Sequence, residues 1–169
     1  MFGFSKKQVA YKTDVIENII GVGLPNRNKF MNYGDVADEN IYSGYAIGRV
    51  FTDDQDRLSF EFDAVYLHYL IAVLAKVGVP GEQSADALQA VLDNFEISQD
   101  EQRKFKQRLR DYESLDDEGV AEKFVDNLNV VDFPESYREL SRKTLGEQFS
   151  RLTKGVERFV TDELRAAKA

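Results

Sequence analysis

The sequence predicts a mainly α-helical protein: a single bundle of five to six helices around a central apolar helix at residues 63–77. Two observations lead to this fold. Between Asp63 and Gly78, the central stretch AVYLHYLIAVLAKV has only His68 and Lys76 as strongly polar residues, which is typical of a helix with neighbours on several faces. Several later segments repeat apolar residues at spacings of three and four, the pattern of a helix with one buried face.

Length and composition restrict the class of protein further. The 169 residues fit one domain, which we place at 13–166 after a flexible lead at 1–12. With no cysteine and one histidine, disulfides, thiolate nucleophiles and multi-histidine metal sites are excluded. The formal charge of −8 is opposite to the basic footprint of nucleic-acid-binding proteins. The first residues do not form a secretory signal, and no stretch is apolar enough to span a bilayer, so we expect a cytoplasmic protein.

The first part of the chain predicts one helix and one less regular region. Apolar residues at helical spacing begin after Thr13 and end at a turn around Gly21 and Pro25. Residues 26–45 fit neither the helical nor the strand period. Residues 46–62 predict a small β-hairpin, because Leu58 and its neighbours alternate apolar and polar after an acidic turn. The same residues also fit a helix that leads into the central one.

The acidic residues around this turn resemble a metal site only superficially. A calcium loop needs oxygen ligands at alternate positions, a glycine at the sixth and a glutamate at the twelfth. Counting from Asp54, the sixth position is Ser59 and the twelfth is Val65. We therefore interpret the acids as a solvated turn followed by the N-cap of the central helix at Asp63. The acids in question are Asp53, Asp54, Asp56, Glu61 and Asp63.

Four more helices are expected after the central one. Gly78 and Pro80 end the central helix. Helices then follow at 84–95, at 98–112 after the capping box from Ser98 to Glu101, and at 114–128. The longest helix is expected at 132–165, where apolar residues step by four, three, four and three. Its apolar seam closes the bundle or, alternatively, forms a dimer. The seam consists of Leu145, Phe149, Leu152, Val156 and Phe159.

Residues 69–110 carry a family resemblance. An apolar helix, a glycine-containing turn, a second amphipathic helix ending near an aromatic residue and a capped third helix follow one another there. This layout, over about a quarter of the chain, resembles the TerB-like family associated with tellurite resistance and stress responses. The resemblance implies a helical fold and a stress-associated role. The family's turn is typically acidic and implicated in metal binding, whereas residues 77–81 read VGVPG, so no metal ligand is carried over.

No residue is nominated for catalysis and no cofactor is expected. His68 has only apolar neighbours at helical spacing, which predicts a neutral, hydrogen-bonded core histidine rather than a catalytic base. We expect a non-enzymatic protein–protein binding module, an adaptor or an immunity-type or stress-associated inhibitor. Two alternatives stay open. One is a small carboxylate-based or metal-dependent enzyme, which a cleft with two or more acids and His68 at its edge would favour. The other is a structural subunit that forms homo-oligomers through the C-terminal helix.

The candidate partner site is the acidic segment at 111–122, DYESLDDEGVAE, which holds six acids and no base. Acids in the first turn of a helix also stabilise its dipole, so part of this charge has a structural explanation. A convergent acidic ridge would speed the association of a basic partner. On this hypothesis, reversing Asp116 and Asp117 to lysine slows association and leaves the melting temperature nearly unchanged. The site residues are Asp111, Glu113, Asp116, Asp117 and Glu118.

Overall fold

A computed structural model describes residues 11–23, 55–128 and 135–168 of the chain. Every regular element in these residues is a helix, which confirms the predicted mainly α fold as a helical bundle. The region at 26–45 and the first half of the predicted hairpin lie outside the described residues. The helices are α1 (Thr13–Gly23), α5 (Gln55–Lys76), α6 (Gly81–Asn94), α7 (Gln99–Tyr112), α8 (Asp117–Leu128) and α9 (Glu135–Ala166).

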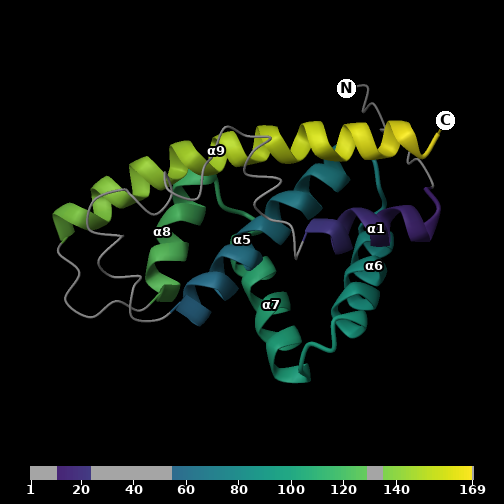
Figure 1. Cartoon of the computed structure of the whole chain (residues 1–169). Coiled ribbons are helices and arrows are strands. Elements are labelled where there is room, and N and C mark those ends of the chain that lie inside the picture. The colour runs from purple at the N-terminus through teal and green to yellow at the C-terminus, as the bar shows by residue number, and fades with distance from the viewer. Residues whose placement is uncertain (1–10, 24–54, 129–134, 169) are drawn as a thin grey trace, which may run out of the picture.

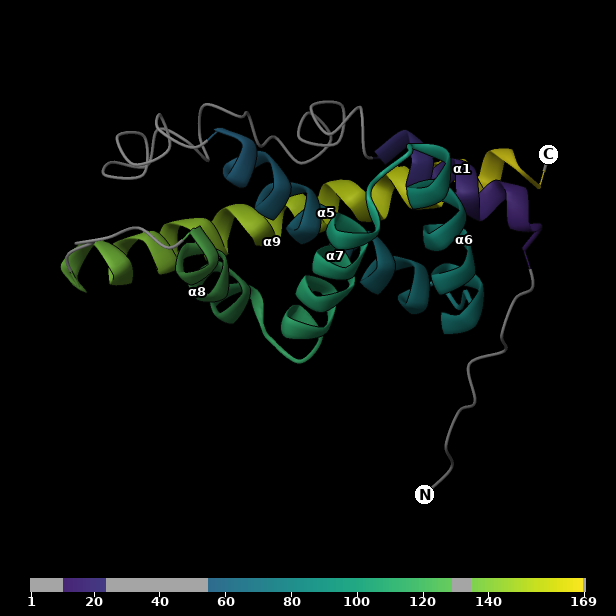
Figure 2. The same ribbon diagram turned by 90° about the horizontal axis from the view of Figure 1, so that it is seen from below.

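The longest helix, α9, runs along one side of the molecule, and α5 crosses it (Figure 1). Helix α8 packs against the N-terminal half of α9, whereas α1 packs on α6 near the other end. Helices α6 and α7 diverge from their shared turn in both views (Figures 1 and 2). Helix α5 contacts each of the other five described helices. It therefore holds the central place that its apolar sequence predicts.

Helix α5 begins at Gln55, so the predicted strand at 57–62 is wrong. Phe62 is fully buried, and the buried positions continue at helical spacing through Tyr66 and Tyr69. Six alternating residues fit a strand when read alone. In the chain they extend the buried face of the following helix, and that burial decides the conformation. Asp63 consequently lies inside α5 and does not cap it.

Glu61 is the clearest departure from the predicted solvated acidic turn, because its side chain is only 2% exposed. The Arg108 Nε donates to both Glu61 carboxylate oxygens at 2.9 Å, and Nη2 donates to Oε1 at 2.8 Å. Asn127 Nδ2 donates to Glu61 Oε2 at 3.3 Å and to the Tyr112 hydroxyl at 3.2 Å. The hydrogen bond to Glu61 raises the pKa of Arg108. One carboxylate thus connects α5, α7 and α8.

The seam of α9 closes the bundle. Its five apolar residues are at most 3% exposed, so a homo-oligomer that used this helix would need another face. Gly146 interrupts the helix where α8 comes close. A Cβ built on Gly146 would lie 3.3 Å from the Cα and 3.2 Å from the Cγ of Glu118. This close approach explains a glycine in a helix interior, which costs about 1 kcal/mol relative to alanine.

Local sequence signals set the end of α5 and the start of α7. Gly78 has φ 95°, its N–H donates to the Ala75 carbonyl, and the Val79 N–H donates to that of Leu74. This is a Schellman motif, and it ends α5 as predicted. The Glu101 N–H donates to the Ser98 hydroxyl at 3.3 Å, which confirms the cap of α7. Among the described helices, none has the length and apolarity to cross a membrane.

We expect Glu61→Ala to lower the free energy of unfolding by about 2–3 kcal/mol, because it leaves Arg108 partly buried without its carboxylate. Urea unfolding measures the loss. The control is Glu147→Ala on the exposed side of α9, which should change stability by less than about 0.5 kcal/mol. Equal effects of the two substitutions would show that the Glu61–Arg108 pair does not hold the bundle together.

Candidate functional site

Helices α5, α6 and α7 line an open groove of about 670 Å³. Helix α5 forms its floor, and α6 and α7 form its walls. A volume of this size and a largely apolar lining are typical of binding sites in proteins. The lining residues include His68, Ile71, Ala72 and Ala75 of α5, Gly81, Ser84, Ala85, Asp86, Leu88 and Gln89 of α6, and Lys106, Leu109, Arg110 and Glu113 at α7.

Small residues make the hollow. Ala72, Ala75, Gly81 and Ala85 are all exposed, although they line the space between three helices. A Cβ added at Gly81 would meet no atom within 4 Å. Ser84 lies between these positions and is 2% exposed, and its hydroxyl has no hydrogen-bond partner among the described residues. The groove thus has room for another molecule and a buried polar group beside that space.

A hydrogen-bond network fixes the two walls where α6 and α7 converge. Gln102 is 7% exposed, and its Nε2 donates to the Asp93 carboxylate and to the Ile97 carbonyl, both at 3.0 Å. Gln89 Nε2 donates to Asp93 at 2.9 Å and to Gln102 Oε1 at 3.0 Å. The hydrogen bonds from Gln89 and Gln102 lower the pKa of Asp93. This network fixes the angle between the walls without a bound ligand.

The two walls carry opposite charges. Lys106 and Arg110 line the α7 wall one turn apart, and each donates to an amide oxygen, of Gln89 and of Gln107 respectively. Neither forms an ion pair with a carboxylate in the part of the chain described. Asp86 lines the α6 wall, and Glu113 lies at the C-terminal end of α7. Both acids are exposed, so the rim is charged and the floor is apolar.

His68 lies on the groove floor and is half-buried, so the predicted core position is wrong. Its ring centroid lies 5.1 Å from that of Tyr69 and 5.6 Å from that of Tyr112. Burial lowers the pKa of His68, and the charges of Asp117 and Glu113 act in the opposite direction. A lowered pKa favours the neutral imidazole at neutral pH.

The lowered pKa of His68 predicts a pH dependence of stability. As the pH falls below about 6.5, the ordinary pKa of histidine, His68 is protonated in the unfolded chain before it is protonated in the folded protein. The free energy of unfolding should therefore decrease from that pH until the folded protein is also protonated. His68→Gln should flatten this part of the curve. Denaturant unfolding between pH 7.5 and pH 5 measures the difference, and parallel curves for the two proteins would contradict it.

The structure places the five predicted acidic site residues in different environments. Asp111 accepts from Gln107 at 2.8 Å, and its other oxygen lies 3.7 Å from Arg108. Asp116 accepts from the Gly119 N–H at 2.8 Å and caps α8, while Asp117 accepts from the Tyr69 hydroxyl at 2.9 Å. Glu118 lies 3.9 Å from Arg142. Glu113 alone lines the groove.

These hydrogen bonds change the expectation for charge reversal. Asp116→Lys with Asp117→Lys should lower the free energy of unfolding by about 2 kcal/mol, since a helix cap and a charge-assisted hydrogen bond are both lost. The matched control, Glu147→Lys with Glu163→Lys, changes the net charge equally at two exposed residues of α9. Thermal unfolding measures both. Equal melting temperatures would mean that the Asp116 and Asp117 contacts contribute little to the fold.

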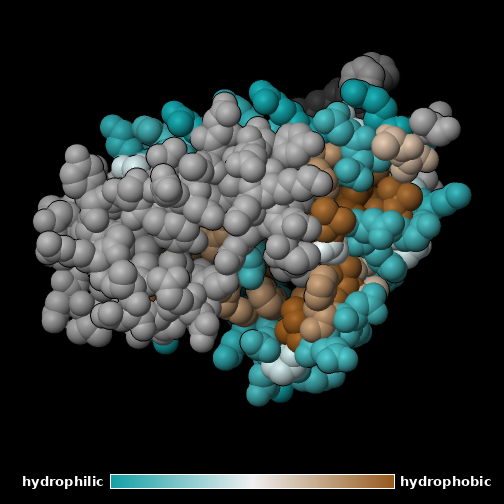
Figure 3. All heavy atoms as spheres, viewed as in Figure 1, coloured by the Kyte–Doolittle hydropathy of each residue, from teal (hydrophilic) through white to brown (hydrophobic). Residues whose placement is uncertain are grey.

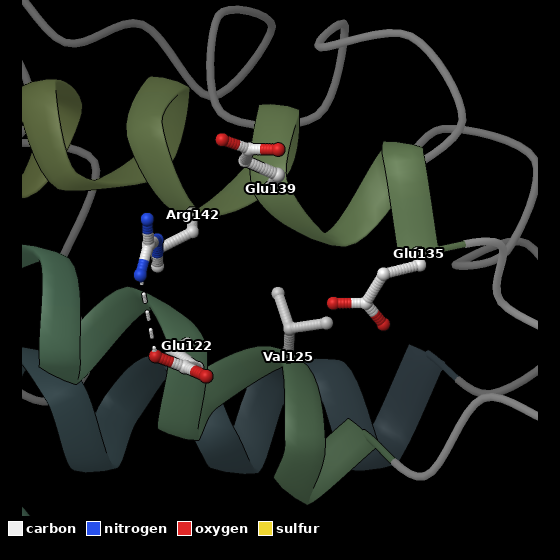
Figure 4. Close-up of a pocket in the computed structure, with 5 residues that line it drawn as sticks. All are labelled: Glu122, Val125, Glu135, Glu139 and Arg142. Carbon is white, nitrogen blue, oxygen red and sulfur yellow. Dashed lines mark ion pairs between the residues drawn. The ribbon is translucent and has the colours of Figure 1, made fainter.

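A second, smaller hollow of about 240 Å³ lies between α8 and α9 (Figure 4). Arg142 reaches from α9 towards Glu122 on α8, at 3.8 Å, and Val125 separates this pair from Glu135. Glu139 points away from the pair (Figure 4). The hollow is thus an ion-paired seam between two helices. Among the described residues, no three His, Cys, Asp or Glu side chains group closely enough to hold a metal ion.

The groove was not predicted from the sequence, because its signal is weak. Alanines at 72, 75 and 85 lie where larger apolar residues would fill the space between helices. Only the angle between α6 and α7 turns these small residues into one hollow. On the face seen in Figure 3, hydrophobic residues gather over α1 and between α6 and α7, with polar residues around them.

The chain matches no protein-family model, no curated protein and no solved structure. The resemblance of residues 69–110 to the TerB-like family therefore stays a sequence-based expectation.

Proposed function

We propose that this protein is a non-enzymatic binding module that holds a segment of a partner protein in the groove between α5, α6 and α7. The observation that carries the proposal is the hollow of about 670 Å³ lined by exposed small and apolar residues. Apolar surface gathered in a concave site and rimmed by charge marks interaction sites. An adaptor or an inhibitor of the immunity or stress-associated kind would act in this way, and a cytoplasmic location is part of the proposal.

The rigidity of the groove supports this role. The Gln89–Gln102–Asp93 network holds the walls at one end, and the Glu61–Arg108 pair holds α7 on α5. A preformed site loses little conformational entropy on binding, so more of the contact energy appears as affinity. Glu113 connects the groove with the acidic segment at 111–122. The acids of that segment can therefore steer a partner that carries some positive charge.

A small enzyme is the second candidate. The groove brings His68 together with Asp86 and Glu113, which is the arrangement that the enzyme alternative asks for. A half-buried, neutral imidazole beside carboxylates can act as a general base. Under this candidate His68→Ala abolishes turnover while binding persists. Under the binding module, the protein turns over no substrate, and His68→Ala changes only the affinity for the partner.

The binding module is tested by blocking the groove. Ala72→Trp fills it from the floor, and Ala166→Trp places the same side chain at an exposed position at the end of α9. Proteins captured from an extract of the native cell are quantified for the parent and both variants, and the captured partner is then purified for calorimetry. We expect Ala72→Trp to weaken binding at least tenfold and Ala166→Trp to leave it unchanged. A partner that binds all three proteins equally would overturn the proposal.

A further inference from the structure

We infer that the occupant of the groove is an amphipathic α-helix of the partner, with carboxylates along the flank that faces α7 and a basic residue on the flank that faces α6. This inference rests on the proposed function and deepens it. It follows from three features of the groove: the absence of a strand edge among the residues that the structure describes, the small side chains on α5 and α6, and the charges on the two walls.

A helical occupant follows from what the groove offers to a peptide backbone. An extended peptide binds by adding a strand to a sheet edge, and the described residues contain no strand. Proline-rich segments dock on aromatic-lined grooves, whereas His68 carries the only aromatic ring among the described residues that line this groove. A helix satisfies its own backbone hydrogen bonds and needs only an apolar trough. That leaves helix-in-groove binding as the mode that fits.

Small side chains on α5 and α6 allow a bound helix to approach closely. Ala72 and Ala75 on α5 and Gly81 and Ala85 on α6 are exposed small residues, and small residues let two helices approach to the shorter end of the usual interaxial distances, roughly 8 Å. The buried Ser84 hydroxyl, which lacks a partner among the described residues, lies on the same wall.

The walls set the charges of the occupant. Lys106 and Arg110 are one turn apart on α7 and bond only to neutral amides, so two carboxylates spaced by one turn on the facing flank would replace neutral contacts by ion pairs. Asp86, on the opposite wall, has neither a hydrogen bond nor an ion pair with any described residue. Glu113 adds a second negative charge at the far end of the α7 wall. A helix with acids beside Lys106 and Arg110 and a base beside Asp86 complements this pattern.

The inference is tested with a display library of 18-residue helical peptides. Their apolar stripe is fixed, and the positions on both flanks are randomised among Glu, Lys and Ser. The baits are the parent chain and three variants of it. The variants are the double substitution Lys106→Glu with Arg110→Glu, the single substitution Asp86→Lys, and the blocked groove Ala72→Trp. A control pair, Arg103→Glu with Lys104→Glu, makes the same charge change on an exposed part of α7 outside the groove. Thermal unfolding of each bait verifies that it is folded.

We expect the parent chain to select glutamate on one flank and lysine on the other, each with about a tenfold preference, which corresponds to about 1.4 kcal/mol. Lys106→Glu with Arg110→Glu should invert the preference on the glutamate flank only, and Asp86→Lys should invert it on the lysine flank only. The control pair should select the same peptides as the parent.

Four results would overturn the inference, and they separate it from the proposed function. In the first result, the Ala72→Trp variant rejects the selected peptides, but the wall substitutions leave the charge preferences on both flanks unchanged. The groove would then remain a binding site, but its occupant would not be a helix selected by its charges. Peptides that bind Ala72→Trp as well as the parent would overturn both. Sedimentation that shows a dimer, which Ala72→Trp dissociates, would assign the groove to a second copy of the chain. Calorimetry that shows tight binding of dodecanoate, without any selected helix, would assign the groove to a small amphiphile.

Discussion

The bidentate contact between Arg108 and Glu61 is the interaction on which the groove depends. Helix α7 has few apolar residues with which to attach itself to the bundle: Phe105 and Tyr112 are buried, and Leu109 is half-buried. A thin apolar face leaves the position of a helix poorly determined. The two-pronged geometry of a guanidinium on a carboxylate fixes both distance and rotation. Because Asn127 joins the same carboxylate, α8 is held in the same arrangement.

That contact also sorts the charges of α7. Five bases occur between residues 103 and 110 of an otherwise acidic chain. With Arg108 turned inwards to Glu61, the helical period places Lys106 and Arg110 on the groove wall and leaves Arg103 and Lys104 exposed to solvent. One buried pair thus decides which cations are structural and which are available to a ligand. The network of Gln89, Gln102 and Asp93 then fixes the opposite wall relative to these cations.

The sequence predicts the helices much better than it predicts the site. Helical spacing and local signals, such as the glycine after α5 and the serine cap of α7, act within a few residues and are therefore readable. The strand prediction at 57–62 failed because six alternating residues satisfy both periods, and only burial against α7 and α8 selects the helix. The sequence predicts a solvated Glu61 for a related reason, since its partner Arg108 is 47 residues away. Asp116 and Asp117 appear as one acidic run, yet one caps a helix and the other holds Tyr69.

The groove shows why a binding site in a helical bundle is hard to recognise from sequence. Its residues come from three helices. On each helix, the residues that line the groove resemble an ordinary solvent-exposed surface or a buried face with small apolar residues. An alanine such as Ala72 on an apolar helix has no distinctive pattern, and neither has a lysine hydrogen-bonded to a glutamine. What distinguishes them is that the walls are held apart by contacts elsewhere, so that small side chains are exposed between rigid supports. If leucine side chains filled this space, the bundle would bury more apolar surface but would lose the binding site. Apolar burial and ligand access compete for the same volume.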